Sequence, residues 1–497
     1  MAEGSRIFSG VEILETRGAL PGVFEQLTCD SRETRAGGLF VALRGSAFDG
    51  HQFLADAAAR GAGAAVVDRF GEPSTLPQIR VADTLAALPR VAANFYGNPA
   101  RDLNITGVTG SSGKTTFTYL RESIWKAEGV RAAVIGTIEY RFDDQIRESP
   151  NTTPLPHEMQ QLLREIADRG IRHVVMEVSS HGLALHRVDE IAFDVAVFSN
   201  LTPEHLDFHP TMDHYRETKK RLFTGHLKPE GTAVLNLDDE TGRRFRDELA
   251  GRKLLTYAVE READVRARGI DMSLDGFRFR LEFPGGRTCD IHSPLIGAHN
   301  VSNLVAAGAA AWASGTPVEV IQQGLEACHG VPGRLESVPN TIGAQVVVDY
   351  CHKPDALEKC LQALAVIPHQ RIITLFGCGG DRDKRKRPLM GEIALRYSDR
   401  VIVTSDNPRT EDPEKIIEDI VAGMSSGRDR YRIIVDRREA LRAGVTELRA
   451  GDILLVAGKG HETYQIIGRQ KYPFDDREIT RALLIEAGKG REDGSWR

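Results

Sequence analysis

Two series of apolar, strand-like runs separated by helical stretches constrain the fold of this chain more than any other feature. The first series is LNITGVT, RAAVIGTI, RHVVMEV, DVAVFSN, TAVLN and LLTYAV. The second series is QVVVDY, RIITLFG, RVIVTSD, YRIIVD and DILLVAG. Apolar strands that alternate with helices are typical of mostly parallel sheets with helices on both faces. The sequence therefore predicts two doubly wound α/β units.

Three domains are expected from the boundaries of these series. Residues 1–102 mix short strands with Gly-rich turns, and GNPARDL is a plausible linker. VPGR, residues 331–334, marks a second boundary, after which the pattern is Rossmann-like. We expect domains at 1–102, 103–333 and 334–497, which suits a length of 497 residues. Polar alternation with Gly turns predicts a small antiparallel insertion at 265–295.

Composition limits the function classes. The net charge is −6 and charged residues make up 27% of the chain, with acids and bases mixed, which argues against a general nucleic-acid binder. MAEGSRIFSG carries no apolar leader, and no run approaches membrane-helix length, so we expect a cytoplasmic protein without membrane insertion. The scattered cysteines contain no CxxC pair and are expected to be reduced thiols.

The segment GVTGSSGKTT, residues 107–116, predicts a phosphate-binding loop between a strand and a helix. Glycines let backbone N–H groups converge on phosphate oxygens, and the helix N-terminus adds a positive dipole. Lys114 can reach the β- and γ-phosphates, and the Thr115 hydroxyl can bind Mg²⁺. The spacing is the short GxxGKT form, because Val108 stands where the longer pattern has glycine. A Gly-rich turn with a surface lysine is the alternative, which the strand context disfavours.

Glu177 ends the apolar run VVME. A carboxylate at the carboxyl end of a strand beside a P-loop is well placed to hold Mg²⁺. Alone it could equally be a capping or ion-paired glutamate; next to a P-loop, the metal role is favoured.

P-loops serve many reactions, so the loop alone does not define this one. Further motifs follow one another from about residue 28 to 466: TCDSR, GLFVALRG, FDGH, TGSSGKTT, NTTP, MEVSSHGLALHRV, NLTPEHLDFH, YRETKKRLF, GAHNVSN, VPGRLE, VDYCHKPD, GCGGDRDKRKRPLM, SDNPR and GKGHETYQ. In this order they closely resemble the Mur ligases, over nearly the whole chain.

The resemblance implies a three-domain α/β enzyme: an N-terminal UDP-muropeptide-binding domain, a central P-loop ATPase and a C-terminal Rossmann-like amino-acid-binding domain. It implies an ATP-dependent ligase that joins meso-2,6-diaminopimelate to the D-glutamate of UDP-N-acetylmuramoyl-L-alanyl-D-glutamate through an acyl phosphate, in peptidoglycan synthesis. ATP as co-substrate and two Mg²⁺ ions are implied as well. We expect a monomer whose partners are these small molecules, without nucleic acid.

The resemblance also assigns site residues in the first two domains. Those matched to UDP-muropeptide binding are Ser31, Ser46, Ala47, Phe48, Asn151, Thr152, Thr153, Ser179, Leu185 and Arg187. Leu185 stands where relatives of this type often carry a polar glutamine, so one hydrogen bond to the muropeptide that the resemblance implies is not supported at this position. Those matched to the phosphates of ATP are Gly110, Ser111, Ser112, Gly113, Lys114, Thr115 and Thr116.

The expected catalytic set is Lys114, Glu177, His205 and Lys219. Lys219 matches a lysine that becomes carbamylated, and its carbamate would join Thr115, Glu177 and His205 as a metal ligand. Only a neutral amine reacts with CO₂, and burial favours that form. Without the resemblance, the run 219–221 reads as a solvated basic helix face and His205 as a surface histidine.

The remaining matches lie later in the chain. Nucleotide contacts are implied for Asn300, Asn303, Arg334, Asp349 and His352. Diaminopimelate contacts are implied for Arg387, Asp406, Asn407, Pro408, Arg409, Gly458 and Glu462. A guanidinium binds a carboxylate through two hydrogen bonds, which suits Arg409 to the extra carboxylate of diaminopimelate. Alone, the DNPR segment would be an Asn-Pro turn. Cys351 and Lys353 replace the more usual Ala and Thr or Asn and are treated as tolerated neighbours.

Three rival functions remain open. A ligase of the same superfamily that adds L-lysine or glutamate is disfavoured by Arg409 and TCDSR. A P-loop motor predicts ATPase activity stimulated by nucleic acid, and no basic stripe supports it. A precursor-binding protein with a relic ATP site is disfavoured because Lys114, Thr115, Glu177 and Lys219 are all present.

Overall fold

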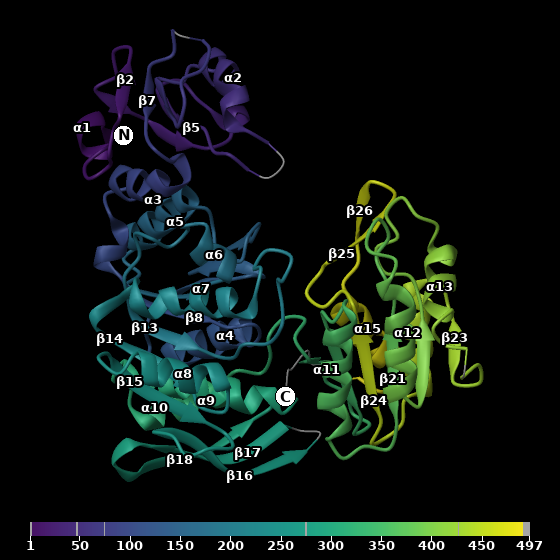
Figure 1. Ribbon diagram of the computed structural model, residues 1–497. Coiled ribbons are helices and arrows are strands. Elements are labelled where there is room, and N and C mark those ends of the chain that lie inside the picture. The colour runs from purple at the N-terminus through teal and green to yellow at the C-terminus, as the bar shows by residue number, and fades with distance from the viewer. Residues whose placement is uncertain (1, 46–47, 74, 274–275, 426, 491–497) are drawn as a thin grey trace. The chain divides into compact units, whose positions relative to one another are not determined.

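The computed structural model describes residues 2–45, 48–73, 75–273, 276–425 and 427–490 (Figure 1). The chain forms two compact units, Met1–Val265 with Ala306–Val320, and Arg266–Val305 with Ile321–Arg497. The division into three domains at residues 102 and 333 stays a prediction. Among the described residues, no helix combines the length and the apolar character that crossing a bilayer requires.

The N-terminal sheet of the first unit has the strand order β2–β7–β6–β5–β4. Its strands are β2 (Glu15–Arg17), β4 (Gln26–Thr28), β5 (Gly38–Val41), β6 (Ala64–Val67) and β7 (Gln78–Arg80), of which β4 to β7 run parallel. Around it lie β1 (Ala2–Glu3), α1 (Gly4–Ile7), β3 (Val23–Phe24), η1 (Ser31–Glu33), η2 (Gly50–Phe53), α2 (Leu54–Ala59), α3 (Thr84–Phe95) and η3 (Pro99–Asp102). Leu39 and Val41 enter one hydrophobic cluster and Phe40 the opposite one, because successive side chains point to opposite faces.

The second sheet of this unit has the order β11–β10–β9–β12–β8–β13–β14–β15. Its parallel strands are β8 (Asn104–Thr109), β9 (Ala132–Ile135), β12 (His173–Glu177), β13 (Phe193–Phe198), β14 (Leu227–Asn236) and β15 (Lys253–Ala258). The hairpin β10 (Glu139–Phe142) and β11 (Gln145–Glu148) adds an antiparallel edge. The helices are α4 (Lys114–Ala127), α5 (Pro156–Asp168), α6 (Ser180–Ala184), α7 (Met212–Thr224) and α8 (Glu240–Glu248).

Strand β8 lies between β12 and β13, so the chain leaves it toward opposite sides of the sheet. The carboxyl ends are level there, with Glu177 opposite Val108 and Phe198 opposite Thr109. In open α/β sheets such a switch point leaves a crevice at the carboxyl ends where ligands bind. The predicted P-loop follows β8 at this point.

The second unit begins with the antiparallel strands β16 (Val265–Ser273), β17 (Gly276–Phe283) and β18 (Arg287–Ser293), which confirms the predicted antiparallel insertion. The short η4 (Pro284–Gly286) joins β17 to β18. Helices α9 (His299–Ala313) and α10 (Val318–Glu326) follow along the chain, and their residues between 306 and 320 belong to the first unit.

The C-terminal sheet has the order β19–β20–β24–β21–β22–β23. Its strands are β19 (Glu336–Ser337), β20 (Gln345–Asp349), β21 (Ile372–Phe376), β22 (Arg400–Val403), β23 (Tyr431–Ile433) and β24 (Ile453–Ala457), parallel except for β19. One cluster packs α11 (Pro354–Ala365), α12 (Lys386–Tyr397) and α13 (Pro413–Val421) on one face, and another packs α14 (Arg437–Glu447) and α15 (Asp476–Glu486) on the other. The hairpin β25 (Tyr464–Ile467) and β26 (Gln470–Pro473) projects from this layer arrangement.

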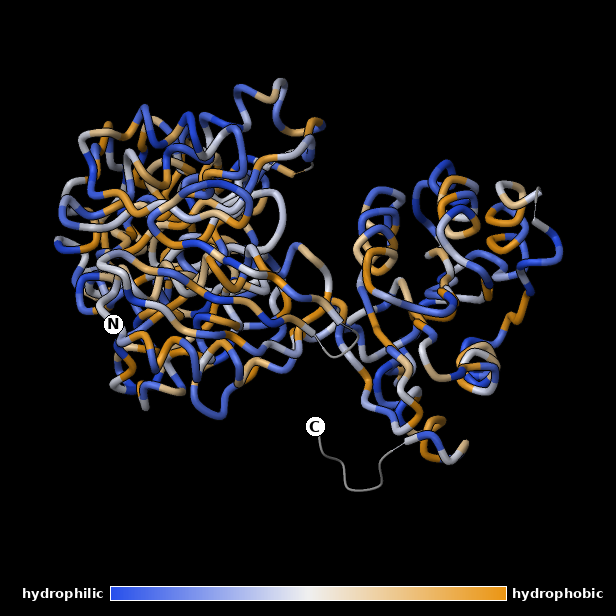
Figure 2. Tube along the Cα trace, turned by 90° about the horizontal axis from the view of Figure 1, so that it is seen from below, coloured by the Kyte–Doolittle hydropathy of each residue, from blue (hydrophilic) through white to orange (hydrophobic). Residues whose placement is uncertain are grey.

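Local signals behave as the sequence predicts. The Asp436 carboxylate accepts a hydrogen bond from the Glu439 N–H at the start of α14, and these two residues form a D-x-x-E pattern that is typical of a helix start. Hydrophobic segments concentrate inside each unit and hydrophilic segments at its periphery (Figure 2). Both doubly wound sheets predicted from the two series of apolar runs are present.

Candidate active site

The strand–loop–helix that carries the P-loop is formed as predicted. Strand β8 ends at Thr109 and α4 begins at Lys114, with the loop between them. Gly113 has φ +86°, in the left-handed region that favours glycine. A Cβ atom on Gly110 would lie 1.9 Å from Ser199 Oγ, so a larger residue would disrupt the loop.

Residues that follow β13 hold this loop in place. The Ser111 N–H donates to the Asn200 carbonyl (2.9 Å), and the Ser112 N–H donates to Asn200 Oδ1 (3.0 Å). Ser199 Oγ donates to the Ser112 carbonyl (2.7 Å). Lys114 Nζ bonds to the carbonyl oxygens of Gly110 (2.8 Å) and Ser111 (3.1 Å), so its charge lies over the loop. Thr115 and Thr116 are buried in the first turn of α4.

Lys219 projects from α7 onto the same loop. Its side chain is 1% exposed, and Nζ donates to the Gly110 carbonyl at 2.9 Å. Nζ also lies 4.6 Å from the ring centroid of Tyr215, whose hydroxyl is 3.2 Å from Ser111 Oγ. The neighbouring Lys220 instead pairs with Glu217 and Glu248 at the surface. Of the two adjacent lysines, only Lys219 faces the P-loop.

The pKa of Lys219 lies well below the usual value for lysine. Burial is the larger cause, because desolvation penalises the ammonium form, and the positive charge of Lys114 adds to it. A neutral amine is therefore accessible at this position. That is the form which reacts with CO₂ to give a carbamate.

Glu177 is 1% exposed at the end of β12. Its carboxylate accepts hydrogen bonds from the N–H (2.8 Å) and hydroxyl (3.0 Å) of Thr137, which orient both oxygens. Gly136 provides the space, since a Cβ atom there would lie 2.6 Å from Glu177 Oε1. Carboxylate and hydroxyl oxygens are ligands that Mg²⁺ prefers, so Glu177 and Thr115 fit a magnesium site.

Several aromatic side chains surround His205, the predicted metal-associated histidine. Its ring centroid is 4.9 Å from that of His181 and 6.4 Å from that of Tyr215. His209 is buried, with Nδ1 3.1 Å from His214 Nδ1. Burial, followed by the positive charge of His214, lowers the pKa of His209 to about 4. His209 is therefore a neutral ring at physiological pH.

Four of the residues matched to muropeptide binding, Thr152, Thr153, Ser179 and Arg187, form one connected group. Thr153 Oγ1 donates to the Glu177 carbonyl (3.0 Å) and lies 3.1 Å from Ser179 Oγ. The Arg187 guanidinium donates to the Thr153 carbonyl (2.7 Å). Thr152 Oγ1 lies 3.0 Å from Thr137 Oγ1, which links the group to the Glu177 carboxylate.

The other matched residues of this set differ in their surroundings. Tyr140 donates to the Asn151 carbonyl at 2.9 Å. Leu185 is the half-buried C-cap of α6. Ser31 is buried at the start of η1, and Phe48 is 72% exposed. Ser46 and Ala47 lie outside the described residues.

Residue Cys29, which follows β4 of the N-terminal sheet, contacts helix α5. Cys29 Sγ lies 3.6 Å from His157 Nδ1 at the start of α5. A cavity of about 1010 Å³ borders this contact, lined by residues of the N-terminal region such as Thr28 and by residues of α5 that include His157 and Glu158. None of the predicted muropeptide residues lines the part of it formed by described residues.

In the second unit, the predicted nucleotide-contacting residues lie in three places: on α9, at the end of β20 next to Arg334, and in the loop after β20. Asn303 Nδ2 donates to Asn300 Oδ1 (2.9 Å) on α9. Asp349 Oδ2 accepts from the Leu335 N–H (2.7 Å), next to Arg334. His352 Nδ1 bonds to the Tyr350 carbonyl at 2.9 Å in the loop after β20.

The predicted amino-acid loop is held by the GKGHE segment. Asn407 Nδ2 donates to Glu462 Oε2 (2.8 Å), and Lys459 Nζ, fully buried, donates to Asn407 Oδ1 and Glu462 Oε2 (both 3.1 Å). A Cβ atom on Gly458 would lie 2.7 Å from Asp406 Oδ2, so the two segments touch. The structure thus brings Asp406, Asn407, Gly458 and Glu462 together; Pro408 is buried between them and Arg409.

Arg409 and Arg387 have different environments. Arg409 is half-buried with φ +52°, and NH1 donates to the Gly380 carbonyl at 2.8 Å. Arg387 is 1% exposed, and its guanidinium pairs with Glu411 (2.9 Å) and Asp419 (2.9 Å). In this arrangement Arg387 supports the loop, while Arg409 is the more accessible guanidinium.

Three residues contact the site although the sequence motifs predicted no role for them. Tyr215 stands in the YRETKKRLF motif without an expected role, yet it contacts both Ser111 and Lys219. Thr137 lies in the apolar run RAAVIGTI but in none of the family motifs, and yet it supplies two hydrogen bonds to Glu177. Lys459 stands inside GKGHE, so the motif itself held the signal for its contact with Asn407.

Family models match three consecutive segments of the chain. "Mur ligase family, catalytic domain" matches residues 23–96, "Mur ligase middle domain" matches 108–311, and "Mur ligase, glutamate ligase domain" matches 333–460.

Similar proteins match along nearly the whole chain. One from Geobacter metallireducens, named UDP-N-acetylmuramoyl-L-alanyl-D-glutamate–2,6-diaminopimelate ligase, is 47% identical over 96% of this chain and 97% of its own length. A protein of that name from Clostridioides difficile is 40% identical over 96% and 98%. A solved structure of a ligase with the same name has a TM-score of 0.70 at 34% identity, covering 94% of this chain and 95% of its own. By these matches, and by the folded P-loop and strand order described above, the chain belongs to the Mur ligase family.

Proposed function

We propose that this protein is an ATP-dependent ligase that adds meso-2,6-diaminopimelate to the D-glutamate of UDP-N-acetylmuramoyl-L-alanyl-D-glutamate. The observation that carries the proposal is the contact of Lys219 with the P-loop. A buried lysine of lowered pKa on a loop carbonyl is poised for carbamylation rather than for solvation. The names of the similar proteins supply the substrate class.

The donor set fits magnesium. Thr115 and Glu177 would hold one Mg²⁺ ion, and the carbamate of Lys219 with His205 would hold a second. The hydroxyl, carboxylate and carbamate oxygens are ligands that suit a hard cation, and the His205 imidazole would add a nitrogen ligand. Bound at these residues, the metal ions would neutralise negative charge on the phosphates of ATP.

The chain's own residues then account for the first chemical step. The muropeptide carboxylate must approach the γ-phosphate of ATP, and both are anionic. Lys114 and the positive end of the α4 dipole, which begins at Lys114, stabilise the charge on the phosphate oxygens. Attack on phosphorus breaks the bond to ADP and leaves an acyl phosphate on the D-glutamyl side chain.

The second step forms the amide. The amine of diaminopimelate attacks the acyl carbon, and the tetrahedral intermediate collapses with loss of inorganic phosphate. The loop with Asn407 and Arg409 is proposed to orient the amino acid, because a guanidinium binds a carboxylate through two hydrogen bonds. Glu462 is proposed to pair with the distal ammonium. Its contact with buried Lys459 fixes its position.

The proposal also covers the cellular location and the oligomeric state of the protein. The six cysteines lie among the described residues and are free thiols, which together with ATP use favours the cytoplasm. A monomer is proposed, since each predicted substrate group is matched by residues of one chain.

Phosphate release provides the direct test. Purified protein is given ATP, Mg²⁺ and UDP-muramoyl dipeptide, with diaminopimelate in one arm and L-lysine in the other. We expect turnover with diaminopimelate and little with lysine. Equal use of lysine would refute the amino-acid assignment and keep the ligase assignment; no release in either arm would refute both.

A further inference from the structure

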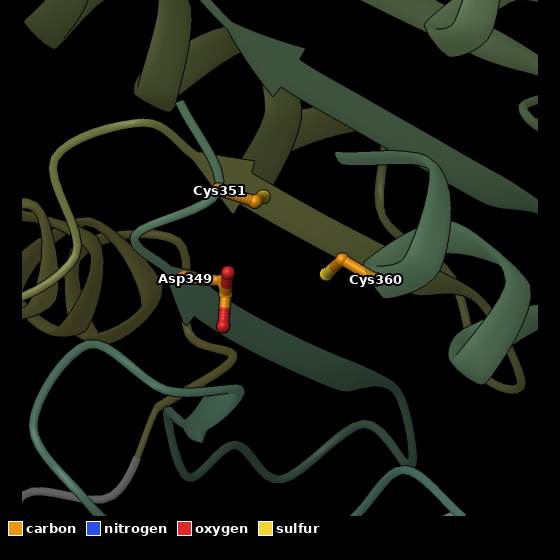
Figure 3. A group of neighbouring side chains, drawn as sticks. All are labelled: Asp349, Cys351 and Cys360. Carbon is orange, nitrogen blue, oxygen red and sulfur yellow. The ribbon is translucent and has the colours of Figure 1, made fainter. Parts of the chain in front are cut away.

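Three side chains that could bind a metal converge in the C-terminal sheet, at the carboxyl end of β20. Asp349 ends that strand, Cys351 follows in the loop, and Cys360 projects from α11 (Figure 3). One carboxylate oxygen and the two sulfur atoms all lie within 4.8 Å of one another. Figure 3 shows the three side chains around a common space.

The cluster is sheltered and its members are oriented. Cys351 is 2% exposed and Cys360 7% exposed, so both thiols are sheltered from water. The Leu335 N–H donates to Asp349 Oδ2, which restrains the carboxylate from its other side. Interaction with the neighbouring Cys360 thiol, followed by burial, raises the pKa of Cys351 well above the usual value. Both sulfurs are therefore protonated, and a cation would displace two protons to solvent.

Distances and donor chemistry both point to a soft cation. Zinc binds sulfur at about 2.3 Å and carboxylate oxygen at about 2.0 Å, so tetrahedral ligand atoms lie about 3.5 to 3.8 Å apart. The three atoms, all within 4.8 Å of one another, would move closer by about 1 Å at most when an ion binds. Thiolates select zinc-like cations over Mg²⁺, and three protein ligands leave one position of a tetrahedron for a further ligand.

We propose that Asp349, Cys351 and Cys360 form a binding site for one thiophilic divalent cation of the zinc class. This site differs in chemistry from the oxygen-rich magnesium set of the P-loop unit. A disulfide between the two sulfurs would need an oxidant and would give Asp349 no part in the cluster. The cation links the end of β20 to α11 and so stabilises this unit.

Because Asp349 also belongs to the predicted nucleotide contacts, zinc and ATP are expected to compete. The expected competition rests on the proposed function, whereas the binding of zinc to the cluster does not. An experiment can therefore refute the competition without refuting the metal site.

Cobalt titration of the full chain, after removal of metal with a chelator, tests the site. We expect one equivalent of Co²⁺ to produce a thiolate-to-cobalt charge-transfer band, which oxygen ligands in the P-loop unit cannot give. Cys351→Ala and Cys360→Ala should each lose most of that band, and Zn²⁺ should displace it in the wild type. Cys29→Ser and Cys328→Ser, which remove cysteines outside the cluster, should keep it.

X-ray absorption of the zinc-loaded wild type gives a readout that needs no variant. We expect two sulfur ligands and at least one oxygen or nitrogen ligand per zinc. Absence of the cobalt band, a band unchanged in both alanine variants, or a zinc shell without sulfur would overturn the proposal. A normal band without competition by ATP would leave the site standing and count against the nucleotide role of Asp349.

Discussion

Lys219 on α7 donates a 2.9 Å hydrogen bond to the carbonyl of Gly110, the same P-loop oxygen that Lys114 reaches at 2.8 Å. Two lysine nitrogens thus share one acceptor, and Lys219 is the buried one. Proximity of like charges favours loss of a proton from the more buried amine. The arrangement prepares Lys219 for reaction with CO₂ while Lys114 stays available for phosphate.

Replacing Lys219 with alanine is expected to lower the ligase rate by about 100-fold or more, in line with loss of a group that stabilises transition-state charge. Added bicarbonate should not restore activity, because no amine remains to carbamylate. Phosphate release at saturating substrates measures this. Lys220→Ala is the matched control, since Lys220 pairs with Glu217 and Glu248 at the surface, and it should retain activity. Full activity of Lys219→Ala would remove the carbamate from the mechanism.

The lowered pKa of Lys219 also predicts how stability depends on pH. Between that lowered pKa and the ordinary value near 10.4, the unfolded chain binds one proton more than the folded chain at this site. Stability therefore rises with pH in this window, by up to about 1.4 kcal/mol per pH unit from this group. Lys219→Met removes the penalty, so the variant should melt higher than the wild type at neutral pH, by a margin that shrinks as the pH rises.

Melting curves from about pH 7 to about pH 9.5 in CO₂-free buffer provide the measurement. Lys220→Met serves as the control, because ion pairs with Glu217 and Glu248 raise the pKa of Lys220 and its titration falls above this range. A margin for Lys219→Met that stays constant with pH would contradict a charged-to-neutral transition of the buried amine.

Thr137 is expected to govern magnesium affinity through Glu177. Thr137→Val removes the hydroxyl that donates to Glu177 Oε2 and keeps the backbone N–H bond. Loss of an outer partner of a metal-binding carboxylate typically weakens metal binding about 10- to 100-fold. The Mg²⁺ concentration for half-maximal ATP turnover should rise accordingly, while Thr137→Ser keeps the hydroxyl and should stay near the wild type. Equal magnesium requirements in both variants would show that the backbone bond alone orients Glu177.

Arg409 is expected to select diaminopimelate. Arg409→Lys keeps the charge and loses the planar pair of donors, so the KM for diaminopimelate should rise about 10- to 100-fold, the loss of a hydrogen bond to a charged group. The KM for ATP should change little. Arg385→Lys is the control, because Arg385 is exposed, precedes α12 and pairs with Asp383. A rise in the KM for ATP instead would place Arg409 near the nucleotide.

The sequence predicted the elements that depend on local patterns. The P-loop, the capping Asp436 and the parallel strands follow from short-range composition and periodicity, and the structure contains them. The antiparallel hairpin of β10 and β11 was not foreseen, because its short polar strands lack an apolar run.

The features of the site that could not be predicted from the sequence depend on contacts between residues that are far apart in the chain. The run from Lys219 to Arg221 reads as one solvated face, and only the fold separates buried Lys219 from surface Lys220. Arg387 was matched to the amino acid by its motif, yet its ion-pair partners Glu411 and Asp419 stand 24 and 32 residues away. Spacing in one sequence carries no information on such pairs, so the substrate role of Arg387 stays a prediction.

The last prediction concerns the buried ion pair that supports the amino-acid loop. Arg437 and Asp476 are both 0% exposed, and the guanidinium pairs with the carboxylate through two bonds of 2.8 and 2.7 Å. It also donates to the carbonyls of Ser405 and Ala457, which directly precede the DNPR and GKGHE segments. Asp476→Ala leaves a buried charge unpaired and should lower the free energy of unfolding by about 3–5 kcal/mol.

Urea denaturation followed by a probe in the C-terminal sheet measures this cost. Arg442→Ala breaks an exposed pair with Glu486 between the same helices, α14 and α15, and should cost no more than about 1 kcal/mol. The double variant Arg437→Met with Asp476→Leu removes both charges and should be more stable than Asp476→Ala alone, because no unpaired charge remains in the interior. Similar costs for Asp476→Ala and Arg442→Ala would mean that water reaches the guanidinium, and the loop would then owe its position to Lys459 and Glu462 rather than to this pair.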